Sequence, residues 1–476
     1  MESNIKFPSE ILSIALQHLC PQDLVSCSRT CWTWNAIANT LLYEAVSLSS
    51  IADFRQFVEC ISDSKDHHGG CAENTSGSHQ PPLGQLVKAV EITGGYTQFD
   101  DRRNYSSTLS RLASHTPNVH TAKLFLPILS LDTVGGSPFS WSTLAAQWPK
   151  LTKLTLKGSM NTGVDTYDLH NINHVLYRLQ HLNITRCDNI LTHIRTPLPF
   201  LQCLVATIYS PSDYQALKKF LRTCQTTLHT LIIELWCFHR QALFNLDDLD
   251  IGHKQLKAFG LMKHDMSQVI MTNFGDNLEH FECWNISPGP DAVLDPSIHQ
   301  GMKKTSNLKT LSFAGNMAVY EISRVLLANK NTLHTFYLNH DRGIDLIPLL
   351  QENKVQLYNV VTLCFKCKLL EDAHVHSLAK VFPNVKFLAL CRNMRSGHMT
   401  KTNRIKTMPD GSILTVWEFK KGGPWISTEA LSHFQHLKAL DKITFSELED
   451  QSLSTLRQCD IFRPIHKGQP SVIPLS

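Results

Sequence analysis

The stretch LKTLSFAGNMAVYEISRVLLANKNTLHTFYL, residues 308–338, holds two copies of one apolar pattern with a helical segment between them. Each copy reads apolar-x-x-apolar-x-apolar, first as LKTLSF from Leu308 and then as LHTFYL from Leu333. The alternation that ends each copy is typical of a short strand, and the spacing of MAVYEISRVLLANK is typical of an amphipathic helix. The stretch therefore predicts a unit of one strand followed by one helix.

The same pattern recurs along most of the chain. Its ten clear copies begin at Leu151, Leu179, Leu201, Leu228, Leu256, Leu278, Leu308, Leu333, Val360 and Val385. These starts span 234 residues in nine intervals, a mean of 26 residues. That spacing resembles the leucine-rich repeat, whose units run to roughly 20–29 residues.

Weaker copies of the pattern begin at Tyr43, Val87, Val119 and Leu440. One strand and one helix cannot bury their own apolar faces, whereas stacked copies can. We therefore predict an α/β fold, a curved leucine-rich-repeat solenoid with parallel strands on the concave face and helices on the convex face. Because side chains alternate along a strand, the x positions are expected to face the concavity.

Two irregular segments divide the chain. Residues 62–84, SDSKDHHGGCAENTSGSHQPPLG, are polar and rich in Gly, Ser and Pro, which is typical of a flexible loop. A second such stretch, 392–426, reads as an insertion with a candidate hairpin at MPDGSILTVWEF. We expect a helical domain over 1–48, a first repeat helix and flexible loop over 49–84, and the solenoid over 85–476.

The segment before the repeats, FPSEILSIALQHLCPQDLVSCSRTCWTWNAIANTLLYEAV (7–46), reads as three short helices and a strand. Pro8 and Ser9 signal the first helix start, and Pro21 ends that helix and opens the next. The segment resembles an F-box, a family with a Leu-Pro-acidic start, a Pro-x-Asp-Leu middle and a Val-Cys-Lys-x-Trp end. This chain differs in having Phe7 for the leucine, Thr30 for the valine and Trp32 for the basic residue.

The resemblance implies that the helices dock onto a Skp-type adaptor, which links to a cullin scaffold and ubiquitin transfer. The positions it assigns to this contact are Phe7, Pro8, Ile11, Leu12, Leu16, Leu24, Cys27 and Trp34. The alternative is a small helical domain with no partner. We favour docking, because the apolar face is larger than about forty residues can bury by themselves.

Two aromatic side chains suggest a second contact surface, on the repeats. Trp284 and Tyr337 occupy alternating strand positions that are expected to face the concavity. The candidate protein-binding residues around them are His280, Glu282, Trp284, Thr335, Tyr337 and Asn339. Packing between repeats is the competing interpretation, because a slip of one residue in the strand phase would invert the faces.

Other classes of function find little support in the sequence. The formal charge is only +4 over 476 residues, which argues against a dedicated nucleic-acid or membrane surface. Phosphate-loop, dinucleotide, serine-hydrolase and zinc-protease motifs are absent, and Cys364-x-x-Cys367 on a strand would point its thiols to opposite faces. His67, His68, Cys71 and His79 match no zinc-binding spacing. We expect no catalytic residue, cofactor or metal.

The N-terminus lacks a signal-peptide pattern, and no stretch reaches the roughly 18 apolar residues that would span a bilayer. We therefore expect a cytoplasmic or nuclear protein with its 14 cysteines reduced. The favoured function is a non-catalytic substrate receptor of an SCF-type ubiquitin ligase, with the repeats holding an unknown protein substrate. The alternative is a leucine-rich-repeat scaffold that acts outside ubiquitin transfer.

Overall fold

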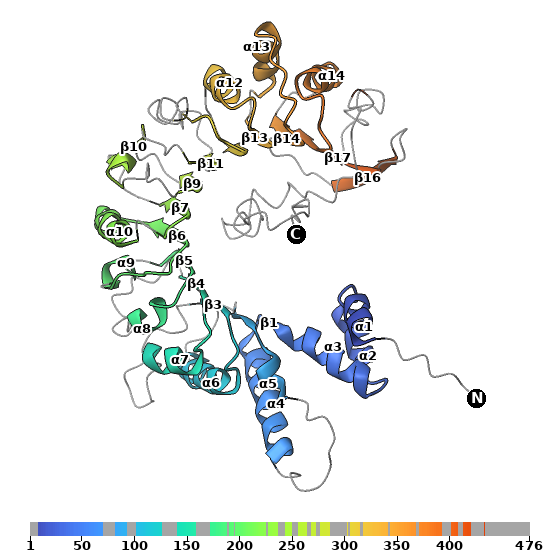
Figure 1. The fold of residues 1–476 in the computed structure, drawn as a ribbon, viewed down its shortest axis with the longest axis vertical. Helices are drawn as coiled ribbons and strands as arrows, with labels where there is room; N and C mark the ends of the chain where they lie inside the picture. Colours follow the sequence, from blue (N-terminus) through green and yellow to red (C-terminus); the bar gives the residue numbers. More distant parts are fainter. Residues whose placement is uncertain are drawn as a thin grey trace, which may run out of the picture. The chain divides into compact units, whose positions relative to one another are not determined.

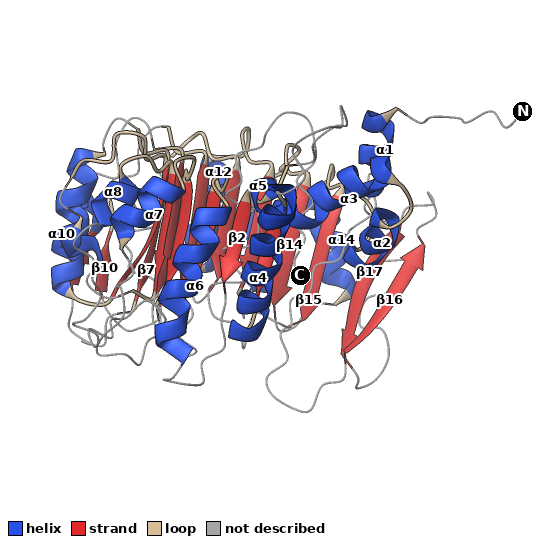
Figure 2. Ribbon diagram, turned by 90° about the horizontal axis from the view of Figure 1, so that it is seen from below, coloured by secondary structure: helices blue, strands red, loops and turns tan. Residues whose placement is uncertain are grey.

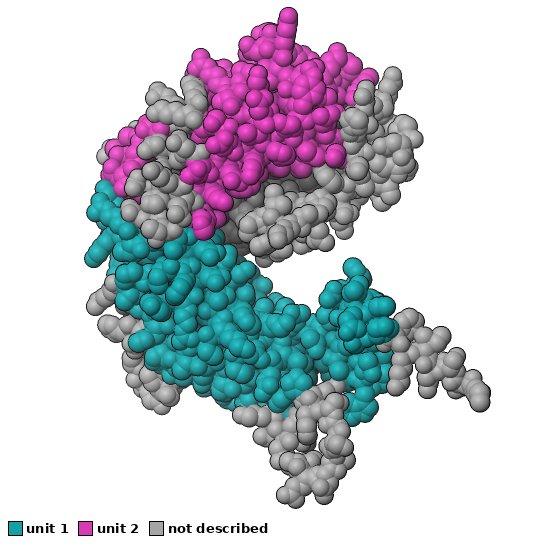
Figure 3. Space-filling model, viewed as in Figure 1, with its two compact units in different colours: residues 1–207, 215–227 teal, residues 208–214, 228–476 magenta. Residues whose placement is uncertain are grey.

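The computed structural model describes residues 8–69, 81–92, 101–125, 140–158, 172–187, 190–194, 196–224, 227–236, 243–249, 256–263, 268–272, 277–285, 302, 305–314, 318–340, 343–367, 371–392, 401–407, 413–419 and 433. The chain forms two compact units (Figure 3). The first comprises residues 1–207 and 215–227, and the second comprises residues 208–214 and 228–476.

Three short helices open the first unit: α1 (Ser9–Leu16), α2 (Pro21–Ser28) and α3 (Trp32–Glu44). Pro8 is the N-cap of α1 and Pro21 lies at the first position of α2, so the predicted helix starts are confirmed. Proline suits a first turn because its fixed φ is helical and its missing N–H would have no partner there. The buried centre of the three helices consists of Leu12, Leu16, Leu24 and Ala38, with Cys27, Trp34, Ile37, Leu41 and Leu42 packed against it.

Parallel strands and the helices between them make up the rest of the described part of the first unit. The strands pair in the order β1-β2-β3-β4-β5-β6. Their bounds are β1 (Ala45–Leu48), β2 (Ala89–Ile92), β3 (Thr121–Phe125), β4 (Lys153–Lys157), β5 (His181–Thr185) and β6 (Cys203–Ile208). The helices that follow the strands are α4 (Ile51–Gly69), α5 (Leu83–Leu86), α6 (Asp101–His115), α7 (Trp141–Gln147), α8 (Ile172–Leu176), α9 (Ile190–His193) and α10 (Pro211–Thr223). They lie on one face of the sheet (Figures 1 and 2).

The second unit continues the same plan, with parallel strands in the order β7-β9-β11-β12-β13-β14-β15. Their bounds are β7 (Thr230–Leu235), β9 (Ala258–Lys263), β11 (His280–Asn285), β12 (Thr310–Ala314), β13 (Thr335–Asn339), β14 (Thr362–Cys367) and β15 (Phe387–Arg392). The helices α12 (Val319–Ala328), α13 (Leu346–Glu352) and α14 (Asp372–Val381) cover one face (Figure 1). The opposite face of each sheet is called the strand face below.

The strand positions confirm the repeat pattern. Every clear copy has its strand two residues after its first apolar residue; β12, for example, begins at Thr310, two residues after Leu308. The weaker copies at Tyr43, Val87 and Val119 correspond to β1, β2 and β3 in the same way, and Leu440 lies outside the described residues. The predicted α/β class, a three-helix domain followed by a solenoid of parallel strands, is confirmed.

Hydrogen bonds tie each repeat to its neighbour. In the first unit the carbonyl oxygen of His120 accepts bonds from the N–H groups of Thr152 (2.9 Å) and Lys153 (3.0 Å). In the second, the carbonyl of Lys309 accepts from His334 (2.8 Å) and Thr335 (3.0 Å). In both units, therefore, one carbonyl oxygen accepts hydrogen bonds from two successive N–H groups of the next repeat. This pattern sets the register of the neighbouring strands.

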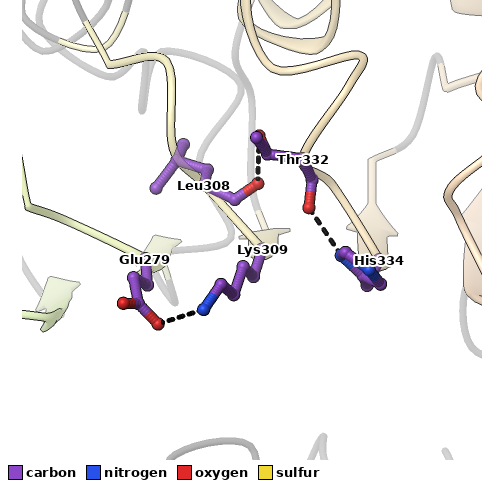
Figure 4. A network of polar contacts seen from close by, with 5 residues as sticks. All are labelled: Glu279, Leu308, Lys309, Thr332 and His334. Carbon is purple, nitrogen blue, oxygen red and sulfur yellow. Dashed lines mark hydrogen bonds and ion pairs between the residues drawn. The ribbon is translucent and has the colours of Figure 1, made fainter.

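Side chains add to this linkage at the turns before the strands (Figure 4). The ammonium group of Lys309 lies 2.7 Å from the carboxylate of Glu279, one repeat earlier. The hydroxyl of Thr332 donates to the carbonyl oxygen of Leu308 at 3.0 Å, and His334 Nδ1 lies 2.6 Å from the carbonyl oxygen of Thr332. Successive repeats are thus held by polar contacts as well as by their shared apolar layer.

The structure differs from the predicted elements in two places. Helix α4 runs to Gly69, into the segment predicted as a flexible loop. A two-stranded parallel sheet, β8 (Leu243–Asn245) and β10 (Gln268–Ile270), stands where a helical repeat was expected.

The candidate hairpin in the predicted insertion is present. Strands β16 (Lys401–Thr407) and β17 (Ile413–Phe419) pair antiparallel, with Lys401 opposite Phe419. The hairpin thus begins earlier than the MPDGSILTVWEF segment that indicated it. The second strand of the pair falls within that segment, and the turn before it lies outside the described residues.

Candidate functional site

The three-helix domain exposes a cluster of large apolar side chains. Ile11 is 55% exposed, Ile14 is 60% exposed and Trp32 is 77% exposed, with Leu19 and Val25 also at the surface. These five make up half of the ten large hydrophobic side chains that are exposed in the described part of the chain. Such a concentration in one small helical domain is typical of a protein-binding surface.

The predicted adaptor-binding residues divide into two groups. Pro8 and Ile11 are exposed, and Cys27 and Trp34 are half-buried against the centre of the domain. The side chains of Leu12, Leu16 and Leu24 are instead inside the domain, where they hold the three helices together. Phe7 lies outside the described residues. The surface therefore also includes Ile14, Leu19, Val25 and Trp32, which the sequence prediction left out.

The predicted protein-binding residues of the repeats share one face, as expected. In the register of β11, β12 and β13, Glu282 lies opposite Ser312 and Ser312 opposite Tyr337. The rings of Trp284 and Tyr337 meet with centroids 5.0 Å apart, although β12 separates their strands. They can do so because β12 presents only the small side chains of Ser312 and Ala314 between them.

This part of the strand face is nevertheless buried. Glu282, Trp284 and Tyr337 are buried, while His280, Thr335 and Asn339 are half-buried. Burial raises the pKa of the Glu282 carboxyl to about 8, and its Oε1 has no hydrogen-bond partner among the described residues. The cluster is therefore a packed layer with a neutral carboxyl group at neutral pH, and it is not an open surface.

The strand face of the first unit is different, because its polar side chains reach the surface. Lys153 on β4 is exposed, and Thr155, Lys157, His181 and Asn183 on β4 and β5 are half-buried. The residues between them, such as Leu154 and Leu156, are buried against the helices. The accessible part of the strand face thus lies on β3, β4 and β5, which sequence reasoning did not select.

Three cysteine thiols in the described part of the chain have a shifted pKa, and none of them is an activated nucleophile. Burial raises the pKa of Cys203 and of Cys283 to about 12 and also raises that of Cys224. A thiol of raised pKa is a poor nucleophile, because the thiolate is the reactive form. Among the described residues, no three His, Cys, Asp or Glu side chains are grouped to hold a metal ion.

His374 and His376 lie in α14. The Nδ1 atom of His374 accepts a hydrogen bond from the backbone N–H of Glu371 at 3.2 Å, so this histidine caps its helix. Cys364 and Cys367 both lie on β14, as predicted. Within the described part of the chain, no helix is long and apolar enough to cross a membrane.

The family comparison matches the helices described above. The F-box-like family model covers residues 6–49, which includes α1, α2, α3 and β1. The chain contains an F-box-like domain. The resemblance found in the sequence at 7–46 is therefore confirmed, and the matched region ends just after β1, the first strand of the parallel sheet.

The other comparisons are less informative. No curated protein matches the chain. Among solved structures, a chain of the Rad7 and Elc1 complex in yeast is similar with a TM-score of 0.42 and 14% sequence identity. The match covers 83% of this chain and 97% of that one.

Proposed function

We propose that the chain is the substrate receptor of an SCF-type ubiquitin ligase. The F-box-like domain binds a Skp-type adaptor, which attaches the chain to a cullin scaffold, and the repeats bind a protein substrate. The receptor has no catalytic residue in this role. It accelerates transfer by raising the effective concentration of substrate lysines near the charged ubiquitin carrier.

The apolar surface of the F-box-like domain is the observation that supports this proposal most. Ile11, Ile14, Val25 and Trp32 are exposed although they lie in a domain of three helices with a complete small core of its own. Apolar anchors of this kind dominate binding energy at protein interfaces. We assign the adaptor contact to these residues and to Pro8, with Leu12, Leu16 and Leu24 supporting them from inside.

Co-precipitation with a purified Skp-type adaptor tests the assignment. Ile11→Asp and Val25→Asp should each weaken adaptor binding about tenfold or more, because each places a charge in an apolar interface. Leu243→Asp is the matched control, since Leu243 is 56% exposed on β8, far along the chain. Full adaptor recovery by both F-box variants would contradict the assignment.

The same preparation distinguishes a substrate receptor from a scaffold that acts outside ubiquitin transfer. When the wild-type complex is supplied with the cullin and the ubiquitin-transfer enzymes, ubiquitin should be attached to a protein that co-purifies with the repeats. Adaptor binding without any such transfer would favour the scaffold function.

A further inference from the structure

Three successive turns of the first unit present equivalent residues at the surface. Each turn stands directly before a strand and is closed by a hydrogen bond from the N–H of a leucine to the carbonyl oxygen three residues earlier. The bonds run from Leu151 to Trp148 (3.2 Å), from Leu179 to Leu176 (3.0 Å) and from Leu201 to Leu198 (3.2 Å). Because the strands that follow, β4, β5 and β6, are neighbours about 4.8 Å apart, the turns form one row along an edge of the sheet.

The two central residues of each turn are exposed. They are Pro149 and Lys150, Tyr177 and Arg178, and Pro199 and Phe200. We call these six residues the turn surface. Its chemistry is aromatic, cationic and proline-rich, although each of the three turns comes from a different repeat.

Two aromatic rings lie at the centre of the turn surface. Tyr177 and Phe200 are each 53% exposed, and their ring centroids are 6.2 Å apart with the ring planes at 85°. Among the ring contacts of the described residues, this is the one in which both rings are exposed. Exposed aromatic side chains that are already packed against each other are typical anchors of protein interfaces.

The charge around these rings is positive. Lys150 and Arg178 belong to the turn surface, and the described residues between 140 and 207 include no aspartate or glutamate. The partners of the two cations are neutral oxygen atoms, so both charges remain available to a ligand. A partner with carboxylates beside an apolar side chain complements this combination of rings and cations.

Contacts within the chain hold the two cations in place. The guanidinium group of Arg178 donates to the carbonyl oxygens of Pro149 at 2.9 Å and Ala145 at 3.4 Å. The ammonium group of Lys150 donates to the side-chain oxygen of Asn118 at 2.7 Å. Side chains that are ordered before binding lose little rotamer entropy when a partner docks, which favours affinity.

We propose that the turn surface docks an acidic segment of a partner protein that carries an apolar anchor side chain. The anchor packs against Tyr177 and Phe200, and neighbouring carboxylates pair with Lys150 and Arg178. This inference rests on the proposed receptor function and names the chemistry of a substrate segment. The row of three turns is roughly 10 Å long, so about three or four residues of an extended segment cover it.

A protein segment fits the turn surface better than a single-stranded nucleic acid does. Successive bases stack on parallel aromatic faces, whereas the planes of Tyr177 and Phe200 stand at 85° to each other. Pro149 and Pro199 have no backbone N–H to donate to a phosphate. Nucleic acid is therefore the competing ligand that the experiment must exclude.

Fluorescence anisotropy of the full chain with a labelled oligoglutamate peptide that has leucine at its centre tests the proposal. The references are the same peptide with serine for leucine, the same peptide with lysine for glutamate, and a single-stranded oligothymidylate. We expect the leucine-glutamate peptide to bind more tightly than all three references. Its affinity should fall with added salt, because salt screens the pairing of exposed charges.

Substitutions in the turn surface separate the apolar from the charged contribution. Tyr177→Ala should weaken binding of the leucine-glutamate peptide about tenfold, because it removes an aromatic anchor. Tyr177→Phe keeps the ring and should bind nearly as wild type does. Lys150→Glu should weaken binding roughly fivefold, because it replaces attraction by repulsion at an exposed site.

Two controls make these losses specific. Tyr358 is also 53% exposed and is also the first central residue of a turn, closed by Val360 and Leu357 at 3.2 Å, but it shares that turn with Asn359 and not with a cation. Tyr358→Ala should therefore leave peptide binding unchanged. Lys219→Glu changes the charge at an exposed position on helix α10 and should have little effect.

Several results would overturn the docking surface. They are a wild-type chain that does not bind the leucine-glutamate peptide, a loss in Tyr358→Ala as large as that in Tyr177→Ala, and tighter binding of oligothymidylate than of the peptide. The assay contains no adaptor, so failed peptide binding by a wild-type chain that still recovers the adaptor overturns this surface alone. Intact peptide binding by a chain that recovers no adaptor contradicts the F-box assignment alone.

Discussion

At the scale of single residues, Glu282 has the least ordinary environment in the described part of the repeats. Its side chain is 1% exposed, next to the aromatic pair of Trp284 and Tyr337. A buried carboxyl group without an ionic partner is more stable in its neutral form, so the pKa of Glu282 rises from 4.5 to about 8. The folded chain therefore keeps a proton at neutral pH that the unfolded chain releases.

This difference predicts that stability falls as the pH rises from about 4.5 to about 8, by about 1.4 kcal/mol per pH unit from this group. Below that window both states bind the proton, and above it neither does, so the slope vanishes. Glu282→Gln has no proton to lose, and near the upper end of the window it should be more stable than wild type by on the order of 3 kcal/mol. Urea unfolding at about pH 5 and about pH 7.5 measures the difference.

Glu279→Gln is the control for this prediction. Glu279 lies three residues away and forms an exposed ion pair with Lys309, which is worth about 0.5 kcal/mol at most pH values. Its replacement should lower stability slightly and leave the pH dependence between the two measurements unchanged. Equal pH profiles for Glu282→Gln and wild type would show that Glu282 is ionised in the folded chain.

The F-box-like domain shows what a sequence pattern can and cannot assign at this scale. The sequence prediction assigned Leu12 to the adaptor contact and left out Ile14, whereas Leu12 is buried and Ile14 is exposed. Successive helical residues point about 100° apart, and a helix that serves both a core and a partner is apolar around much of its circumference. Only the packing of α2 and α3 decides which side remains open.

At the scale of elements, the buried amide of Asn329 joins a helix end to a strand. Asn329 follows α12, and its side-chain oxygen accepts a hydrogen bond from the backbone N–H of Leu308 at 3.0 Å. Its amide nitrogen donates to the carbonyl oxygen of Val325 at 3.0 Å. The residue thus connects the helix of one repeat with the start of the strand that precedes it.

Asn329→Ala should destabilise the chain by about 2 kcal/mol, because it leaves the buried N–H of Leu308 without its acceptor. Asn359→Ala is the control, since the Asn359 side chain is exposed and bonds only the carbonyl of Asn331. Chemical unfolding of both variants gives the comparison. A loss in Asn329→Ala no larger than that in Asn359→Ala would contradict the proposed role of the amide.

The helices and strands were predicted best where apolar residues recur at a regular spacing in the sequence. The strands followed from the spacing of apolar pairs such as Leu308 and Leu311, which repeats in register from unit to unit. Strands β8 and β10 were missed because three residues carry no readable alternation. The end of α4 was missed because its last turns, up to Gly69, are polar, and a helix needs no apolar face where it leaves the core.

At the scale of the molecule, the strand face differs between the two units in a way that no single repeat encodes. Lys153 on β4 and Glu282 on β11 both belong to the set of alternate residues whose side chains take the strand face. Nevertheless, Lys153 is exposed and Glu282 is buried. The repeat pattern determines which side chains share a face of the sheet, as the register of β11, β12 and β13 shows. Whether that face is open depends on residues distant in sequence, which a local pattern does not report.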